Sequence, residues 1–285
     1  MKPSLFQLPI YTASWQEFWE LLKSRLEQAD SKGLLLVFTP NPEQVVQASQ
    51  NQDFFKTLKS GDILLPDGIG LLLANRFIRF RQKVRAFLKL SPSDPAMPVK
   101  IAEKITGVET ADKLLMEAAK KNYLSLIIGG RNYAEFWGKE GGEYEGEVFE
   151  DEKSLIQLKK NLYWTEAYQD KEEVLPVEDQ ALEKVLKKIK PQLVFVALGA
   201  PDQEKWLVDW RAPLEQAGVV VAMAVGGSFD LLFGRIARAP RLFRSLGLEW
   251  FWRLLQQPWR WRRQLRLIQY LFLVRQEAKR WQKLS

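Results

Sequence analysis

Three features of the amino-acid sequence predict an α/β fold, with a parallel sheet covered by helices on both faces and a basic helical appendage at the C-terminus. Short apolar runs alternate with amphipathic stretches along residues 14–225, and such alternation is typical of a parallel sheet. Turns with glycine or proline follow several of the apolar runs. Residues 235–285 carry 13 Lys or Arg against two acidic residues. We therefore expect a large domain at 1–234 and a basic, Trp-rich appendage at 235–285.

The alternating pattern begins in the first hundred residues. Trp15, Phe18 and Leu22 are spaced for one face of a helix, and the unbroken apolar run at 34–38 has the length of a buried strand. The predicted elements are a helix at 14–30, a strand at 34–38, a helix at 43–51, a strand at 62–66 and a helix from 68 to about 80. Residues 81–100 are basic and contain three prolines, so we expect an excursion over the site there.

The pattern continues through the second half of the chain. The predicted elements are a helix at 109–121, strands at 124–128, 193–198 and 219–225, helices at 178–190 and 202–216, and two tail helices at 241–257 and 259–283. An acidic, glycine-rich stretch at 139–153 has the composition of a solvated loop, and we assign it no chemistry.

Composition excludes several classes of chemistry. The 285 residues include no Cys and no His, which rules out thiol nucleophiles, Ser-His triads and Cys/His zinc sites. Acid-base catalysis would then fall to Asp, Glu, Lys or Tyr. The first fifteen residues carry one Lys and no long apolar run, and no window of 18 apolar residues occurs. We therefore expect neither a secretory signal nor a membrane span.

The basic tail indicates an anionic partner. The net charge is +7, but residues 1–234 hold 29 basic and 33 acidic residues, so the excess lies in the tail together with five of the 11 Trp. Nucleic acid, anionic lipid and a phosphorylated substrate are the candidate partners. A basic helix with Trp, Leu and Phe on its other face describes an in-plane membrane helix, and equally a helix docked on a domain.

Asp67 is the strongest candidate for a catalytic group. It follows the apolar run at 63–66, and Gly68 and Gly70 then open a helical segment. Ligands of open α/β sheets bind at the carboxyl ends of the strands. The alternative is a helix N-cap, since Asp is a favoured capping residue. Asn41 lies in another such turn, held between two prolines, so its side chain is free to face a ligand.

Two further turns follow predicted strands. Gln203 and Glu204 lie in the first turn of a helix and suit hydrogen bonding to a sugar or a base, although Asp202 beside them is also an ordinary helix cap. Paired glycines at Gly226 and Gly227, before a hydroxyl residue, can cradle a phosphate. The Gly226 turn is neither a Walker nor a dinucleotide-binding sequence, and the turn at Gly68 and Gly70 also lacks the dinucleotide-binding pattern, which disfavours ATP and NAD.

A metal site is weakly supported, because none of the 12 Asp lie two residues apart in the Asp-x-Asp arrangement that holds a divalent ion on a sugar diphosphate. Arginines can neutralise phosphates without an ion. Arg253, Arg260 and Arg263 are seven and three residues apart, so they share one face if the chain stays helical through Pro258.

Taken together, the turns resemble those of a known family. The motifs are Thr39-Pro40-Asn41-Pro42, Pro66-Asp67-Gly68-Ile69-Gly70, Thr106-Gly107-Val108-Glu109, Gly199-Ala200-Pro201-Asp202-Gln203-Glu204, Gly226-Gly227-Ser228-Phe229-Asp230, and Arg238-Ala239-Pro240 through Gly247-Leu248-Glu249-Trp250 to Arg253. Their order and approximate spacing are similar to those of the WecG/TagA/CpsF glycosyltransferases, over about residues 34–263.

The resemblance implies a Rossmann-like fold and a specific reaction. Members transfer an N-acetylmannosamine-type sugar from a UDP-sugar to a polyprenyl-diphosphate-linked GlcNAc, for teichoic acid, enterobacterial common antigen or capsule-like polymers. The resemblance further implies an inverting, metal-independent enzyme without cofactors, peripheral at the cytoplasmic face of the bacterial membrane, with an anionic membrane surface as partner and no nucleic acid. Self-association into a homo-oligomer is left open.

Residue roles follow from the matching motifs. Asp67 corresponds to the proposed general base and Thr39 and Asn41 to a polar pair near the sugar. The remaining donor or sugar-binding candidates are Lys104, Gln203, Glu204, Gly226, Gly227 and Asp230. Arg253, Arg260 and Arg263 correspond to appendage arginines that reach the diphosphate.

The chain departs from the family pattern in ways that bear on the donor. Lys104 stands where the family usually has Arg, Glu109 replaces an Asp, and the 81–100 excursion is longer than expected. Two alternatives to the leading interpretation follow. One is the same fold with another UDP-hexose or UDP-uronic acid as donor. The other is a non-catalytic protein whose basic tail binds anionic lipid or nucleic acid.

Overall fold

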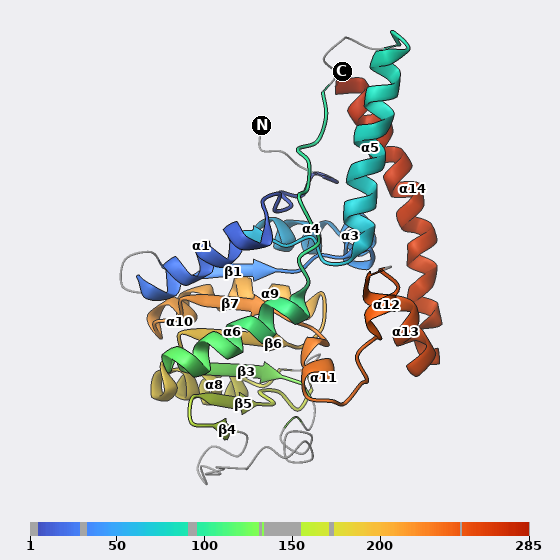
Figure 1. Ribbon diagram of the computed structural model, residues 1–285. Coiled ribbons are helices and arrows are strands. Elements are labelled where there is room, and N and C mark those ends of the chain that lie inside the picture. The colour runs from blue at the N-terminus through green and yellow to red at the C-terminus, as the bar shows by residue number, and fades with distance from the viewer. Residues whose placement is uncertain are drawn as a thin grey trace. The chain divides into compact units, whose positions relative to one another are not determined.

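The computed structural model describes residues 5–28, 33–90, 96–130, 133, 155–170, 174–245 and 247–284 (Figure 1). It divides into two compact units that the chain visits in turn. Unit 1 contains Met1–Phe18, Thr39–Thr106 and Ala239–Ser285, and unit 2 contains Trp19–Phe38 and Gly107–Arg238. Helix α1 (Trp15–Glu27) begins in unit 1 and ends in unit 2.

Unit 2 is built on a mostly parallel sheet. Its strands, in spatial order, are β1 (Leu35–Phe38), β7 (Val221–Ala224), β6 (Leu193–Ala197), β3 (Ser125–Gly129), β5 (Leu162–Thr165) and β4 (Leu155–Lys159). Only β4 at the edge runs antiparallel to its neighbour. The central strands are almost wholly buried runs of aliphatic residues, as expected where helices cover both faces of a parallel sheet. Their carboxyl ends therefore lie along one edge of unit 2.

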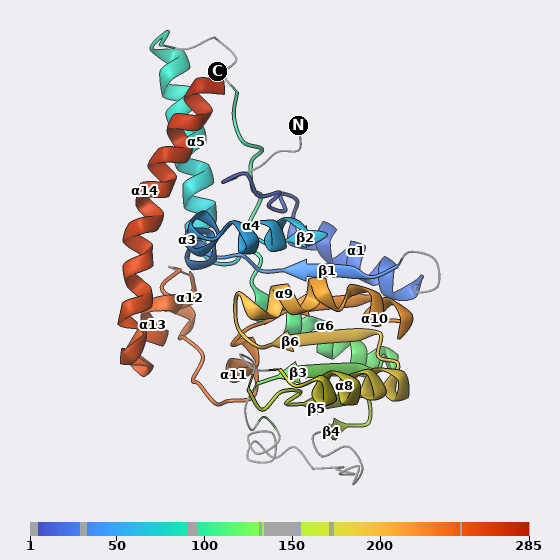
Figure 2. The ribbon, with the colours of Figure 1, turned by 180° about the vertical axis from the view of Figure 1, so that it is seen from behind.

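Helices cover both faces of this sheet. Helix α6 (Gly107–Lys121) lies on one face, and α8 (Pro176–Ile189), α9 (Asp202–Asp209) and α10 (Arg211–Gln216) lie on the other (Figures 1 and 2). The short helix α11 (Ser228–Leu232) follows the carboxyl end of β7. The predicted α/β fold, with a parallel sheet between two helical layers, is confirmed.

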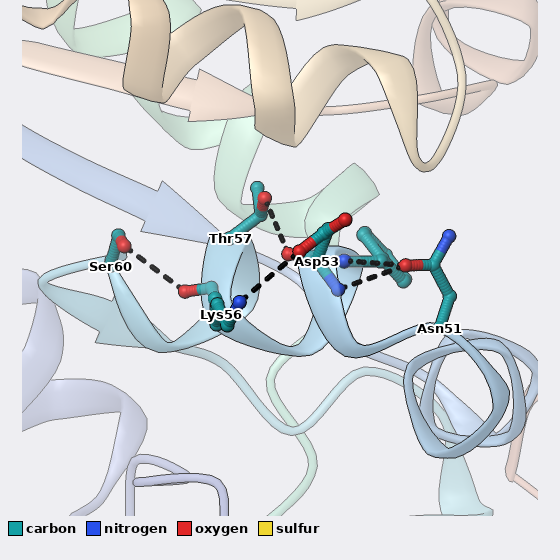
Figure 3. A network of polar contacts seen from close by, with 6 residues as sticks. Asn51, Asp53, Lys56, Thr57 and Ser60 are labelled. Carbon is teal, nitrogen blue, oxygen red and sulfur yellow. Dashed lines mark hydrogen bonds and ion pairs between the residues drawn. The ribbon is translucent and has the colours of Figure 1, made fainter.

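Unit 1 is mostly helical. It contains β2 (Ile63–Leu64) and the helices α3 (Pro42–Gln50), α4 (Gln52–Lys59), α5 (Ile69–Phe87), α12 (Arg241–Ser245), α13 (Glu249–Gln256) and α14 (Trp261–Leu284), with the 3-10 turn η1 (Pro258–Arg260) before α14. Helix α4 is held by local polar contacts. The Asn51 side chain caps it by accepting from the amides of Asp53 and Phe54, and Lys56 pairs with Asp53 at 3.2 Å (Figure 3).

Helices α5 and α14 lie side by side and run in the same direction (Figures 1 and 2). Tyr270 of α14 donates its hydroxyl to the Gly70 carbonyl of α5 at 3.1 Å. Burial raises the pKa of Tyr270 well above its usual range, so this hydroxyl stays protonated as a donor. Further along, Gln282 accepts from Arg81 at 3.0 Å when its amide oxygen faces the guanidinium. These contacts fix the register of the two helices.

Several predicted elements differ from the structure. Helix α5 continues to Phe87 instead of ending near Phe80, so its last two turns occupy the first part of the predicted 81–100 excursion. The predicted helix at 202–216 is broken at Trp210, and α4, β4 and β5 were not predicted. The acidic segment at 139–153 lies outside the described residues. The predicted domain boundary at residue 234 stays a prediction, and residues 39–106 pack in one unit with the tail.

Candidate functional site

The Asp67 turn is hydrogen-bonded to the turn that follows β1. The Asp67 amide donates to the Pro40 carbonyl at 3.1 Å and to the Leu65 carbonyl at 2.9 Å. Helix α5 begins after Gly68, which is its N-cap and has a φ of 82°. The alternative in which Asp67 is the helix cap is therefore wrong. Asp67 itself is half-buried, so its carboxylate is within reach of solvent and of a ligand.

Close packing between the two turns requires Gly70. A Cβ atom built on Gly70 would lie 2.4 Å from Cγ of Pro42, far inside contact distance. Any other residue would push the two turns apart. Two motifs that are separate in the sequence are thus held together by a glycine and a proline, and they carry Asp67, Thr39 and Asn41.

Asn41 has a structural role that the sequence analysis did not predict. Its side-chain oxygen accepts from the Gln44 amide at 3.0 Å, and the Gln44 side chain accepts from the Asn41 amide at 3.2 Å. This reciprocal capping box starts α3. The expectation that the Asn41 side chain is free was wrong for its oxygen, which leaves the amide nitrogen to contact a ligand. Thr39 is buried, with 6% of its surface exposed.

The segment around Lys104 joins the same turns. The Ile105 amide donates to the Pro66 carbonyl at 3.2 Å. Lys104 forms an ion pair with Glu249 at the start of α13, at 3.6 Å. Gly247, just before α13, approaches Ile69 so closely that a Cβ atom there would lie 2.7 Å from the Ile69 side chain. The tail motif therefore packs against the first residue of α5, two positions from Asp67.

Arg263 reaches the start of α3 through a two-pronged ion pair. Its Nε and Nη2 donate to the two carboxylate oxygens of Glu43 at 2.6 and 2.9 Å. Arg266 lies 3.5 Å from the same carboxylate. Glu43 is the second residue of α3, two positions after Asn41. One of the predicted diphosphate ligands is thus placed beside the turn that carries Thr39 and Asn41.

The other tail arginines are arranged differently from the prediction. Gln257 has φ −130° and ψ 73°, which is not helical, and a 3-10 turn follows it. The chain is therefore not helical through Pro258, and the argument that Arg253, Arg260 and Arg263 share one helix face fails. Arg253 is half-buried on α13. The side chain of Arg260 lies outside the described residues.

Gln203 links two glycine turns at the carboxyl edge of the sheet in unit 2. Its side-chain oxygen accepts from the Gly199 amide at 3.2 Å and from the Gly226 amide at 2.9 Å. Its amide nitrogen donates to Glu204 at 2.8 Å. Gln203 and Glu204 are both buried, with 2% and 0% of their surfaces exposed. As placed here, the side chain of Gln203 holds the two glycine turns together.

The glycine pair lies at the same edge. Gly226 has a φ of 50°, and Gly227 is the N-cap of α11. Asp230, in the first turn of that helix, lies 3.5 Å from Arg235 and accepts from the Tyr133 hydroxyl at 3.4 Å. The alternative in which Asp202 caps α9 is wrong, because the N-cap is Pro201. Arg238 and Glu109, from two of the family-like motifs, form an ion pair at 3.3 Å.

The structure thus gathers the predicted residues into two groups. In unit 1, Asp67, Thr39, Asn41, Lys104 and Arg263 belong to turns that contact one another. In unit 2, Gln203, Glu204, Gly226, Gly227 and Asp230 form the second group. The sequence analysis missed Glu43 and Glu249, the carboxylates that pair with the tail and with Lys104. Both lie in the first turn of a helix, where an acid has an ordinary stabilising role. Glu249 belongs to one of the family-like motifs, but neither residue type nor position indicated an ion pair with Lys104 or with the tail.

Within the described ranges, no three acidic side chains are grouped as a metal site would need. None of the helices formed by those residues has both the length and the apolar composition to cross a bilayer.

The family model of the WecG/TagA/CpsF glycosyl transferases matches residues 3–90 and 96–284. The chain belongs to this family. It is therefore a glycosyltransferase, as the order of its turns indicated. The match extends beyond the six motifs and includes the whole of α5 and α14.

Relatives of known activity are similar over most of their length. A Bacillus subtilis (strain 168) protein is 28% identical over 277 residues, 97% of this chain and 92% of its own. One from Bacillus spizizenii is 31% identical over 247 residues, 86% and 79% of the two chains. One from Staphylococcus aureus (strain MW2) is 27% identical over 229 residues, which are 80% of this chain and 74% of the relative. Each is named N-acetylglucosaminyldiphosphoundecaprenol N-acetyl-beta-D-mannosaminyltransferase.

Proposed function

We propose that this glycosyltransferase moves an N-acetylmannosamine-type sugar from a UDP-sugar to a polyprenyl-diphosphate-linked GlcNAc, in the synthesis of a cell-surface polysaccharide or teichoic acid. The acceptor follows from the names of the relatives, which act on N-acetylglucosaminyldiphosphoundecaprenol. The convergence of the Thr39–Pro42, Pro66–Gly70 and Lys104 segments around Asp67 is the observation that carries the proposal.

Asp67 is the general base in this mechanism. The acceptor hydroxyl oxygen forms a bond to the anomeric carbon of the donor, the bond from that carbon to UDP breaks, and the hydroxyl proton passes to the Asp67 carboxylate. Attack from the face opposite the leaving diphosphate inverts the anomeric centre. The chain has no His, and Asp67 is half-buried in a turn fixed by two backbone hydrogen bonds, which suits a positioned base.

Cationic side chains of unit 1 neutralise the phosphates in this mechanism. Arg263 and Lys104 already pair with carboxylates in unit 1, and a diphosphate can replace those partners because its oxygens accept the same charge-assisted hydrogen bonds. Arg253 and Arg260 are proposed to contribute as well. In unit 2, the turn at Gly226 and Gly227 is proposed separately as a contact for the donor, and the bond from the Gly226 amide to Gln203 keeps that turn in place. The mechanism needs no metal ion.

The lipid-linked acceptor places the reaction at a membrane surface. We propose that the protein works as a peripheral protein at the inner face of the bacterial membrane, with the basic tail directed to anionic lipid. Within the same chemistry, another UDP-hexose or UDP-uronic acid is the alternative donor. A panel of UDP-sugars in thermal-shift measurements separates the donors, since the one that binds the folded protein best raises its melting temperature most.

The decisive test replaces Asp67 by Asn. We expect kcat for transfer to a lipid-linked GlcNAc to fall by about 10²- to 10⁴-fold, because the general base is lost, while stabilisation by UDP is unchanged. Asp53→Asn is the matched control, since the Asp53 side chain is 92% exposed on α4 and forms an ion pair with Lys56. Full transfer by the Asp67→Asn variant would remove Asp67 from the mechanism.

A further inference from the structure

Helix α5 exposes a continuous apolar stripe. Five large side chains, three or four residues apart, are on one face of the helix and exposed: Leu73 (53%), Phe77 (45%), Phe80 (66%), Val84 (36%) and Phe87 (85%). The opposite face, which includes Ile78 and Gln82, is buried. A surface helix normally turns its apolar face inward, so this helix carries an apolar face on each side.

The charge of α5 is entirely positive. Its 19 residues include Arg76, Arg79, Arg81, Lys83 and Arg85, and neither Asp nor Glu. Arg79, Arg81 and Arg85 make hydrogen bonds to neighbouring segments. Arg76 and Lys83 are exposed, and at about 100° per residue they lie along one flank of the stripe.

Helix α14 exposes a matching face beside it. Trp261, Leu265, Ile268 and Phe272 form an apolar stripe with exposures of 50% to 59%. Arg275, Lys279 and Lys283 continue the same face with exposed cations. The contacts of Tyr270 with Gly70 and of Gln282 with Arg81 fix how the two helices face each other. At about 100° per residue, Tyr270 lies about 180° around α14 from this stripe, so the stripe is the outer face of α14, directed away from the Gly70 contact.

We propose that the exposed stripe of α5, together with the outer face of α14, docks onto an anionic lipid bilayer. Aromatic and aliphatic side chains enter the boundary between headgroups and acyl chains, and the flanking cations bind the lipid phosphates. The inference deepens the proposed function, because a polyprenyl-linked acceptor is held in a bilayer. It adds α5 to a contact that the sequence analysis had assigned to the tail alone.

Two other occupants fit this face less well. In a symmetric dimer, the same basic helix would meet its own copy, and α5 has no acidic residue to pair with Arg76 or Lys83. Nucleic acid would pair with the cations but would leave five large apolar side chains against a polar backbone. A bilayer with anionic lipids satisfies both the apolar stripe and the charge.

Fluorescent labelling of the full chain tests the docking directly. The chain has no Cys, so Phe80→Cys and Phe87→Cys each give one site for an environment-sensitive fluorophore. On vesicles of phosphatidylcholine with phosphatidylglycerol we expect a blue shift at both sites, and quenching by nitroxide-labelled lipid. Met116→Cys is the matched control, because Met116 is 63% exposed on α6 of unit 2, and its label should stay in water.

Vesicle cosedimentation of an unlabelled variant gives an independent measurement. The triple substitution Phe77→Ser, Phe80→Ser and Phe87→Ser should weaken partitioning onto the anionic vesicles by about tenfold or more. Met116→Ser with Val177→Ser, at 63% and 64% exposure outside this face, should not. Arg76→Glu with Lys83→Glu should weaken binding to phosphatidylglycerol vesicles and leave the weak binding to pure phosphatidylcholine unchanged.

Opposite results overturn the proposal. If labels at 80 and 87 stay in water while the protein cosediments, α5 does not touch the bilayer. If the triple variant binds as the parent does, the stripe contributes nothing. A blue shift that grows with protein concentration in the absence of vesicles would assign the face to a second copy. None of these measurements uses a sugar nucleotide, so they are separate from the test of Asp67.

Discussion

The two groups of candidate residues differ in how their polar side chains are used. In unit 2, Gln203 is 2% exposed, and its amide makes three hydrogen bonds to Gly199, Gly226 and Glu204. In unit 1, the cations pair with carboxylates at partly exposed positions: the side chains of Lys104 and Glu249 are 22% and 34% exposed, and those of Arg263 and Glu43 are 50% and 19% exposed.

The contacts of Gln203 in unit 2 are therefore hard to break, whereas the ion pairs in unit 1 can exchange partners. A buried amide with its bonds made is costly to disturb, because each broken bond leaves a polar atom unsatisfied. A partly exposed ion pair has a small net energy and can exchange one anion for another. We infer that unit 2 contributes preformed backbone geometry, whereas unit 1 contributes charges that change partner when a ligand arrives.

The largest effect on stability is expected from Gln203→Ala. Removal of three buried hydrogen bonds should lower the free energy of unfolding by about 2 to 4 kcal/mol, measured by urea denaturation. Gln157→Ala is the control, since the Gln157 side chain makes an exposed bond to the Lys160 carbonyl and should cost under about 0.5 kcal/mol. Equal losses of unfolding free energy in the two variants would show that the Gln203 side chain does not stabilise the two glycine turns.

Gly70→Ala should have the next largest effect. Its new Cβ would overlap Pro42, and relief of that overlap should cost about 1 to 3 kcal/mol and move the Asp67 turn, with a loss of transfer activity. Gly218→Ala is the comparison, because Gly218 has a φ of 82° but no atom within 4 Å of the new Cβ. It should lose stability through backbone strain and keep its activity per folded molecule.

Glu43→Gln should have the smallest effect on stability and the clearest effect on binding. Loss of a partly exposed ion pair should cost under about 1 kcal/mol, while Arg263 loses a competing carboxylate. UDP or inorganic pyrophosphate, measured by calorimetry, should then bind about 2- to 5-fold more tightly. Glu183→Gln, which breaks the Lys187 pair on α8, should change neither. Weaker anion binding by the Glu43→Gln variant would mean that Glu43 orients Arg263 instead of competing for it.

The sequence predicted the parallel sheet and the turns well, because both depend on local signals. Unbroken aliphatic runs mark strands buried on both faces, and glycine or proline marks the turn after each of them. The contacts between the Asp67 turn and the Thr39–Pro42 turn could also be expected, since both follow strands. The family resemblance then indicated the roles of the residues in these turns.

The misses have physical causes as well. Helix α5 runs past Phe80 because its last turns pack on residues 96–98, to which Gln82 and Arg79 donate hydrogen bonds, and a long-range contact of this kind leaves no periodic signal. Strand β4 at the sheet edge and its neighbour β5 follow an acidic segment, and their sequences are not continuous apolar runs. A glutamine side chain can form hydrogen bonds with either a sugar or a backbone amide. The residue type therefore could not show that the Gln203 oxygen accepts from the amides of the two glycine turns.

The interleaved course of the chain has a consequence for synthesis on the ribosome. All segments of unit 2 have been made once Arg238 leaves the peptidyl transferase centre. Unit 1 is different, because α14 supplies buried partners of α5, among them Tyr270. The segment that carries Asp67 must therefore wait until Trp261–Leu284 has been made, and we expect it to complete its folding later than unit 2.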